Sequence, residues 1–207
     1  MLLGPAFEYT IPSVVVFSVM VGALSLGLSR ASRDRDRGVF KRFMVTPLSP
    51  RTYLASEMTA RALVASVQTV IVLGVGMVVY NVEATGELAW LIPLAIMGTL
   101  VFAAIGYVIS VFVDNAEVAN GVGNGVGLLL ILVSGGLPQS LFSPRVGELM
   151  AYLPVKPMLE AMRAVVIDQA SPLASAPKET AILTGWFVVT VLLVTGVFRF
   201  KPPARKT

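Results

Sequence analysis

The sequence contains no cysteine and no histidine, and charged residues make up only 14% of its 207 positions. The absence of both residue types excludes disulfide bonds, thiolate chemistry, histidine-containing catalytic triads and the usual zinc and haem sites. A Gly-x-x-x-x-Gly-Lys-Ser/Thr phosphate loop is also missing, so we do not expect this chain to hydrolyse ATP itself. We therefore expect a protein that is not an enzyme and that binds no cofactor or metal of its own.

Apolar residues dominate the sequence, at 56% of the chain. A soluble domain would carry about a quarter charged residues, well above the share found here. The apolar residues also come in long runs, and a helix needs about 20 of them to cross a bilayer. We therefore predict an all-α polytopic membrane protein that forms a single transmembrane domain over residues 1–207 in the lipid bilayer.

The runs predict five transmembrane spans, at residues 11–29, 62–80, 88–113, 118–133 and 181–198. The helix that contains the second span is expected to begin earlier, at Ser49-Pro50, because serine caps helices and proline suits the first turn. Prolines interrupt residues 134–178. This segment predicts short amphipathic helices, near residues 146–153 and 158–168, that are interfacial or re-entrant.

Positive charge gives the orientation. Lys and Arg greatly outnumber Asp and Glu in residues 30–51 and in the tail after residue 198. Because basic residues accumulate on the cytoplasmic side, both segments and the C-terminus are predicted to be cytoplasmic, and residues 134–178 external. This bias explains the net charge of +4 without a nucleic-acid partner.

An odd number of spans then places the N-terminus outside. The N-terminus lacks a basic region of the kind that begins a cleaved signal peptide. Either an upstream span is missing from this chain, or the chain inserts with its N-terminus outside.

The basic segment carries a pattern of its own. Val39, Phe40, Phe43 and Met44 fall on one helical face, and Lys41 and Arg42 fall on the other. This pattern predicts a short amphipathic helix at the membrane surface or docked on a soluble partner. Thr46-Pro47 ends it, because the residue before proline resists helical geometry. The alternative is that the basic segment is only a solvated positive anchor, which would need no defined helix end or helix start.

The fourth span contains two Gly-x-x-x-Gly pairs and two asparagines one helical turn apart. These residues are Asn120, Gly121, Gly123, Asn124, Gly125 and Gly127. Small residues at this spacing permit close helix contact, so one interpretation is a packing seam whose amides bond across helices. The other is a polar stripe that faces a translocation path or a dimer interface, since polar groups within membranes face interiors.

Polar residues in the second span predict further helix contacts. Ser66, Gln68 and Thr69 are expected to make interhelical hydrogen bonds, and Glu57 and Arg61 precede the span at the spacing of an i,i+4 ion pair. No charged residue lies clearly at mid-span. Ion-coupled carriers usually need such groups, so the pattern argues for energy supplied by another protein.

Three stretches together resemble the ABC-2 type exporter permeases. Residues 35–49 read Arg-Asp-Arg-Gly-Val-Phe-Lys-Arg-Phe-Met-Val-Thr-Pro-Leu-Ser, with Tyr-Leu-Ala at residues 53–55. These residues are similar to the family's charged pair, glycine, short helix and stop before the next span. Residues 132–138, Leu-Val-Ser-Gly-Gly-Leu-Pro, with Pro144, are similar to its pattern after the fifth span. Pro157, Glu160 and Arg163 fit its external helix.

The resemblance implies a permease subunit that forms a homodimer or heterodimer and pairs with separate ATP-binding subunits, which hold the ATP. It implies a bacterial-type plasma (inner) membrane location and outward transport of drugs, lipids or polysaccharides. Residues 30–51 would be the coupling segment. The residues implied to couple to the ATPase are Arg37, Gly38, Val39, Phe40, Phe43, Met44 and Pro47.

Two features depart from the family pattern. The family's first span and the amphipathic helix before it have no counterpart here. Of the acidic residues usual in the family's charged pair and after its glycine, the first is here Asp36, whereas the second position holds Lys41. A non-transporting assembly or scaffold subunit, a truncated permease and a secondary carrier are the alternatives.

Overall fold

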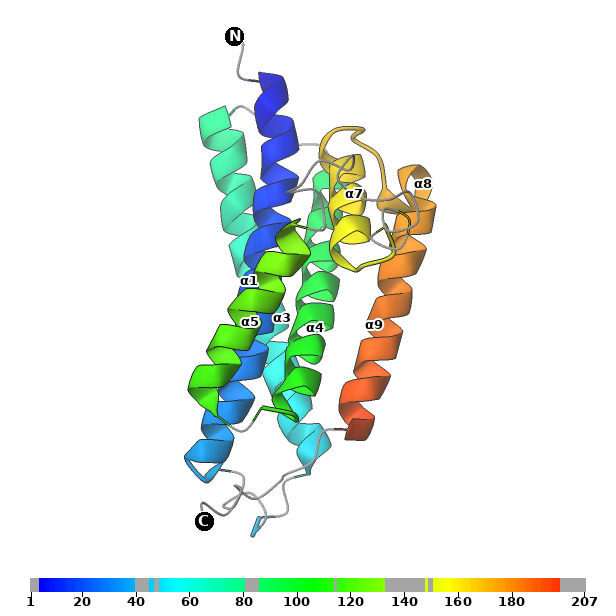
Figure 1. Ribbon diagram of the computed structural model, residues 1–207. Helices are drawn as coiled ribbons and strands as arrows, with labels where there is room; N and C mark the ends of the chain where they lie inside the picture. The colour runs from blue at the N-terminus through cyan, green and yellow to red at the C-terminus, as the bar shows by residue number, and fades with distance from the viewer. Residues whose placement is uncertain are drawn as a thin grey trace.

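The computed structural model describes residues 4–39, 45–46, 49–80, 86–113, 115–132, 148 and 151–197. These residues form helices and no strand, which confirms the all-α prediction. Long helices run nearly side by side along one direction, and the short helices gather at one end (Figure 1). The chain is therefore a helical bundle, as its long apolar runs require.

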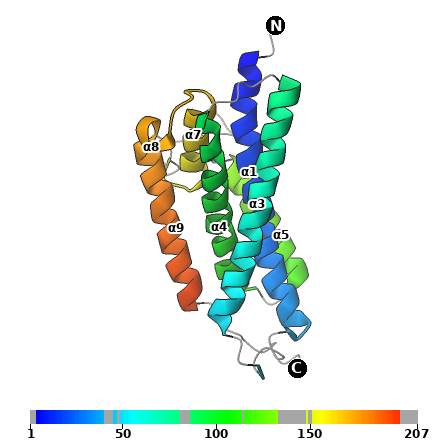
Figure 2. The ribbon, with the colours of Figure 1, turned by 180° about the vertical axis from the view of Figure 1, so that it is seen from behind.

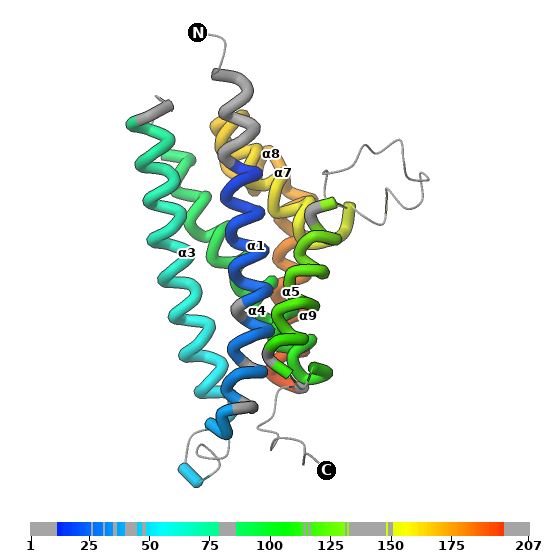
Figure 3. The backbone as a smooth tube through the Cα atoms, turned by 60° about the vertical axis from the view of Figure 1, so that its left-hand side comes forward, coloured from blue at the N-terminus to red at the C-terminus, as the bar shows by residue number. Residues whose placement is uncertain are grey.

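Helix α4, Leu91–Ser110, lies at the centre of the bundle. Helices α1, Gly4–Asp36, and α3, Pro50–Tyr80, pack on it, and α9, Pro177–Val197, covers another side (Figure 2). Helix α5, Ala116–Ile131, packs against α1, so that α1 lies between α3 and α5 (Figure 3). Most side chains of α4 are buried, and this helix therefore forms the core on which the others assemble.

The short elements lie where α1 begins and α3 ends. They are η1, Gly86–Trp90, α7, Val155–Val166, and α8, Pro172–Ser175. Helix α7 packs against α1, α4 and α9 and buries most of its apolar side chains. The opposite end, where α1 finishes and α3 begins, we call the connection end.

Four described helices are long and apolar enough to cross a membrane: Pro12–Asp34, Pro50–Val78, Gly86–Ser110 and Pro177–Gly196. The spans in α3 and α9 are only 17% and 22% buried within the protein. Their exposed residues include Val67, Ile71 and Leu192, which suit contact with lipid tails. These four helices agree with four of the predicted spans.

The helix ends differ from the predicted span boundaries in several places. Helix α1 ends at Asp36, seven residues after the predicted span. Helix α4 ends at Ser110, three residues early, after a start in 3-10 form. Helix α5 has 16 residues and its described continuation stops at residue 132, so the fourth span stays a prediction. The predicted helix at 146–153 lies largely outside the described residues, and the second external helix begins at Val155 rather than near residue 158.

Helices α1 and α4 cross at a pair of glycines. A Cβ atom on Gly27 would lie 2.8 Å from the carbonyl oxygen of Ala103, and one on Gly106 would lie 2.6 Å from that of Leu24. Both obstructing atoms belong to the backbone, which cannot swing aside as a side chain can. The crossing therefore needs glycine in both helices, as close helix contact in membranes generally needs small residues.

Replacing Gly106 by alanine is expected to lower the free energy of unfolding by about 2 kcal/mol, because overpacking forces the two helices apart. Thermal or denaturant unfolding of the purified protein in detergent measures the change. Gly74→Ala in α3 is the control, since a Cβ there meets nothing within 4 Å. Equal destabilisation by the two substitutions would show that the crossing does not depend on Gly106.

Candidate functional site

At the connection end, α1 ends and α3 begins, and local residues determine both helix ends. Gly38 follows α1 with a φ of +67°, the left-handed conformation that commonly ends helices and that glycine adopts without strain. Ser49 directly precedes α3, and its Oγ accepts a hydrogen bond from the backbone N–H of Thr52 at 3.1 Å. Pro50 then occupies the first turn, as predicted. Both helix ends at residues 37–49 are therefore fixed by local chemistry.

The residues expected to contact an ATPase lie between α1 and α3, in residues 37–49, which we call the connection. Phe40, Phe43, Met44 and Pro47 lie outside the described residues. Arg37, Gly38 and Val39 are described, and Arg37 is exposed beyond the end of α1. The coupling role of all seven residues stays a prediction.

One hydrogen bond joins the two helices beside the connection. The Tyr53 hydroxyl, on the first turn of α3, donates to Oδ2 of Asp34 on the last turns of α1 at 2.7 Å. Tyr53 is buried, with 7% of its surface exposed. Arg33 is held along α1, because its guanidinium donates to the carbonyl and hydroxyl oxygens of Ser29. Asp34 and Tyr53 therefore form a strut between the helices that flank the connection.

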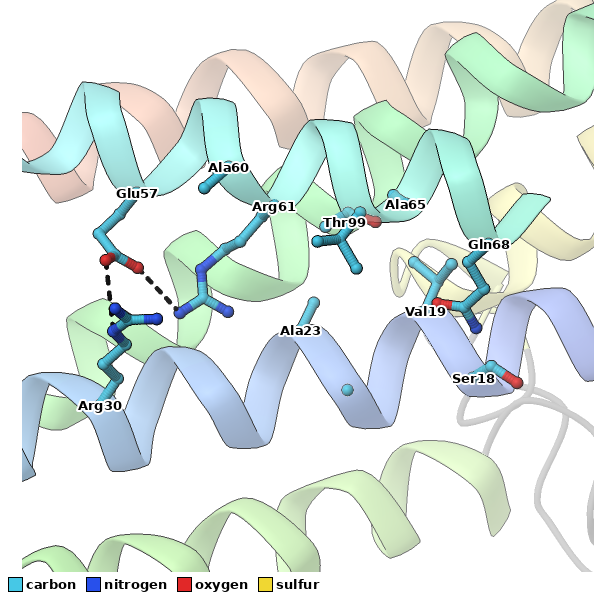
Figure 4. A pocket seen from close by; sticks show the side chains of 12 residues that line it. Ser18, Val19, Ala23, Arg30, Glu57, Ala60, Arg61, Ala65, Gln68 and Thr99 are labelled. Carbon is cyan, nitrogen blue, oxygen red and sulfur yellow. Dashed lines mark ion pairs between the residues drawn. The ribbon is translucent and has the colours of Figure 1, made fainter. Parts of the chain in front are cut away.

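A cluster of charged residues forms a second link, farther along the same helices (Figure 4). Glu57 of α3 pairs with Arg30 of α1 at 3.3 Å and with Arg61, one turn along α3, at 3.5 Å. Tyr107 of α4 donates its hydroxyl hydrogen to Glu57 and accepts one from Arg61. The Arg61 guanidinium also lies 5.5 Å from the centre of the Tyr107 ring, within reach of a cation–π interaction. We call Arg30, Glu57, Arg61 and Tyr107 the charged cluster.

Two members of the charged cluster are largely buried. Arg61 and Glu57 are only 9% and 13% exposed, whereas Arg30 is 57% exposed. The expected Glu57–Arg61 pair is confirmed. Its partners on α1 and α4 were missed, since Arg30 belongs to the predicted coupling segment and Tyr107 to the predicted third span. The available signal was a charged pair at the start of a span, where desolvation demands partners.

A cleft of about 180 Å³ opens beside the charged cluster, between α1 and α3, with Thr99 of α4 at its floor. Figure 4 shows Arg30, Glu57 and Arg61 at one end and Ser18 and Gln68 at the other. Small or apolar residues line the rest: Val19, Gly22, Ala23, Ala60, Val64 and Ala65. The cleft therefore combines a charged end with an apolar wall.

The polar residues of the second span mostly bond within their own helix. Ser66 and Thr69 donate to the carbonyl oxygens of Ala62 and Ala65, at 2.8 and 2.7 Å. The prediction of interhelical hydrogen bonds is therefore wrong for these two residues. A hydroxyl four residues after a carbonyl can satisfy itself locally, so it does not require a partner helix.

The two glycine pairs of α5 lie in different surroundings. Gly123 and Gly127 are buried on the side of α1, where added Cβ atoms would lie 3.4 Å from Ser25 and 3.8 Å from Val21. Gly121 and Gly125 are exposed, with nothing within 4 Å of an added Cβ. One pair thus lies in a helix contact, and the other lies on an open face of this chain.

The asparagines of α5 lie toward the same open face. Asn120 and Asn124 are both exposed. The Ser25 hydroxyl of α1 donates to Oδ1 of Asn124 at 3.4 Å, near the limit for a hydrogen bond. Part of the exposed surface of α5 is therefore polar and small, and we define this open face as Asn120, Gly121, Asn124 and Gly125.

The predicted external residues lie on or beside α7, at the end opposite the connection. Arg163 pairs with Glu160 at 3.1 Å, and Pro157 is buried in the first turns of α7. Both charged residues line a second cleft, about 530 Å³ in volume, that α8 and the start of α9 complete. Residues of this end are far from the charged cluster and the connection.

Comparison with known proteins covers nearly the whole chain. A family model described as "ABC-2 family transporter protein" matches residues 4–195. The comparison finds no matching curated protein and no matching solved structure. The matched range includes all the helices described above except the last two residues of α9, so the connection end and its charged cluster lie within it.

Proposed function

The chain belongs to the ABC-2 family of transporter proteins, and we propose that it is the permease subunit of an ATP-driven exporter. Membership makes it a multi-pass membrane component of an ABC transporter that works with an ATP-binding subunit. In our proposal the ATP is hydrolysed on that separate subunit. This chain contributes the membrane path, and the surface on which the ATPase acts is formed by Arg37, Gly38, Val39, Phe40, Phe43, Met44 and Pro47.

The double link across the connection end is the observation that carries the proposal. Asp34 bonds to Tyr53, and Arg30 pairs with Glu57 about one helical turn farther from the connection. The end of α1 and the start of α3 are therefore joined at two successive turns. A force on the connection would then move the two helices as one body. Through Tyr107 it would also reach α4, the central helix, because interfaces that are tightly packed move as units.

The open face of α5 is the proposed path or dimer surface. Asparagine side chains are costly against lipid tails, so Asn120 and Asn124 suit contact with a second permease subunit or with a water-filled path. Gly121 and Gly125 would let another helix approach closely. A homodimer or heterodimer would bring two such faces together. The transported compound would be a drug, a lipid or a polysaccharide-like substrate of amphipathic or hydrophobic character.

The proposed orientation follows from charge. Residues 30–51 and the C-terminal tail would lie on the cytoplasmic side of a bacterial-type plasma (inner) membrane, where ATP is available. Helix α7 lies at the opposite end of the bundle and would then be external. This orientation places the connection beside a cytoplasmic ATPase.

The proposal is tested by purifying the tagged chain from its native membrane in mild detergent. We expect a protein with a phosphate-loop motif to accompany it in near-equal amount, identified by mass spectrometry, and ATP hydrolysis to be required for transport. A purified chain without an ATPase would favour a scaffold subunit or truncated permease. Transport that continues without ATP would favour a secondary carrier.

A further inference from the structure

We propose that the cleft between α1 and α3 binds an anionic phospholipid, with its phosphate at Arg30 and Arg61 and an acyl chain along the apolar wall. The proposal goes beyond transport and does not depend on the ATPase partner. It rests on unpaired polar atoms, on charge, and on the shape of the cleft.

Two buried polar groups that line the cleft have no hydrogen-bond partner among the described residues. They are Nε of Arg61 and the hydroxyl of Thr99, in side chains that are 9% and 6% exposed. Buried donors are almost always paired, because an unpaired donor retains the full cost of leaving water. Both groups line the same cleft. Each atom is itself shielded from solvent, so acceptor oxygens in the cleft would pair with them after a small rotation of these side chains.

The charge around the cleft favours an anion. Arg30 and Arg61 share a single carboxylate, that of Glu57, which leaves one positive charge in excess. The nearest acidic residue on α1, Asp34, is hydrogen-bonded to Tyr53, and Arg33 is bonded to Ser29. A phosphodiester carries one negative charge and several acceptor oxygens, so it matches both the excess charge and the unpaired donors.

The remaining wall of the cleft favours a lipid over a soluble anion. Beyond the arginines it is formed by Val19, Gly22, Ala23 and Val64, and Val64 is 65% exposed along the outer side of α3. Gly22 leaves open space, since an added Cβ would meet nothing within 4 Å. An acyl chain could follow this wall and leave the cleft sideways into the bilayer.

The depth of the cleft in the membrane is also suitable. Glu57 and Arg61 lie about 10 to 17 Å along α3 from its start, at 1.5 Å per residue. The uncharged part of α3 begins directly after Arg61. The arginines therefore lie near the boundary of the apolar layer, where lipid phosphates are found and where basic pockets between helices bind anionic headgroups.

Lipid retention by the full chain tests the proposal. The protein in mild detergent is titrated with phosphatidylglycerol or phosphatidylcholine of the same acyl chains, and bound lipid is counted by native mass spectrometry. We expect phosphatidylglycerol to bind about tenfold more tightly, and Arg30→Gln to remove that preference. Arg51→Gln is the matched control, because Arg51 is an exposed arginine at the start of α3 that does not line the cleft.

A second pair of variants tests the cleft itself. Gly22→Leu fills the cleft and should abolish retention of phosphatidylglycerol, whereas Gly185→Leu, at an open position of α9, should leave it unchanged. Equal binding of the two lipids, an equal effect of Arg51→Gln and Arg30→Gln, or normal retention by Gly22→Leu would each overturn the proposal. Displacement of the lipid by glycerol phosphate at equal concentration would show a site for the soluble anion and would also overturn it.

Discussion

Replacing Glu57 by glutamine is expected to lower the free energy of unfolding by about 3 kcal/mol, a large share of the stability of a typical domain. Glutamine has almost the same shape, so the change removes charge rather than volume. It leaves the Arg61 guanidinium nine-tenths buried beside a neutral side chain. A buried charge without a counter-charge keeps most of its desolvation cost, which is why breaking such pairs is more damaging than their net contribution suggests. Unfolding in detergent, followed by helical circular dichroism, measures the loss.

The Glu160–Arg163 pair of α7 provides the matched control. Its side chains are 39% and 31% exposed, so Glu160→Gln should cost no more than about 1 kcal/mol. A double variant, Glu57→Gln with Arg61→Gln, should regain most of the lost stability, because no unpaired buried charge remains. Equal losses for Glu57→Gln and Glu160→Gln, or no recovery in the double variant, would show that the charged cluster is not held together by charge.

The long helices were largely predictable from the sequence. Apolar runs gave the positions of α3, α4 and α9 within a few residues, because a helix that faces lipid must be apolar along its whole length. Helix α1 extends seven residues beyond the predicted end of the first span, into the basic segment. Residues 30–36 contain no glycine or proline, and Arg33 bonds back to Ser29, so the helix continues to Asp36.

The charged cluster was only partly predictable. The spacing of Glu57 and Arg61 gives a local pair, but nothing local indicates that Arg30 and Tyr107 join it. Those contacts depend on how α1, α3 and α4 pack together, and α1 and α4 are brought close at Gly27 and Gly106. A tertiary arrangement of this kind is set by helix packing, which a sequence pattern does not specify.

The glycine pairs of α5 illustrate the same limit. Gly121 with Gly125 and Gly123 with Gly127 have identical spacing in the sequence. In the structure the second pair lies toward α1, and the first lies on the open face. The motif predicts that two helices come close. Which glycine pair faces the neighbouring helix depends on the rotation of α5 about its own axis relative to α1. Sequence reasoning therefore left a packing seam and a path or dimer surface as alternatives, and the structure shows one pair in contact with α1 and the other on an open face.

Replacing both Phe40 and Phe43 by aspartate is expected to abolish association with the ATPase while the chain still inserts and folds. In the proposed complex both rings enter an apolar groove of the ATPase, and aromatic anchors of this kind carry a large share of binding energy. Two carboxylates in such a groove would lose that contact and add desolvation, weakening binding about a thousandfold or more. Co-purification of the ATPase with the tagged variant, normalised to the amount of permease, measures the loss.

Val45→Asp is the control within the same segment, because Val45 is 87% exposed and lies outside the predicted apolar face. It adds a carboxylate beside the connection but should leave ATPase binding nearly unchanged. The strut of Asp34 and Tyr53 and the charged cluster should remain intact in both variants, so helical content and unfolding should match the unmodified chain. If the doubly substituted chain binds its ATPase as well as the Val45 variant does, the predicted apolar face is not the coupling surface. The rigid link between α1 and α3 would then serve the stability of the bundle alone.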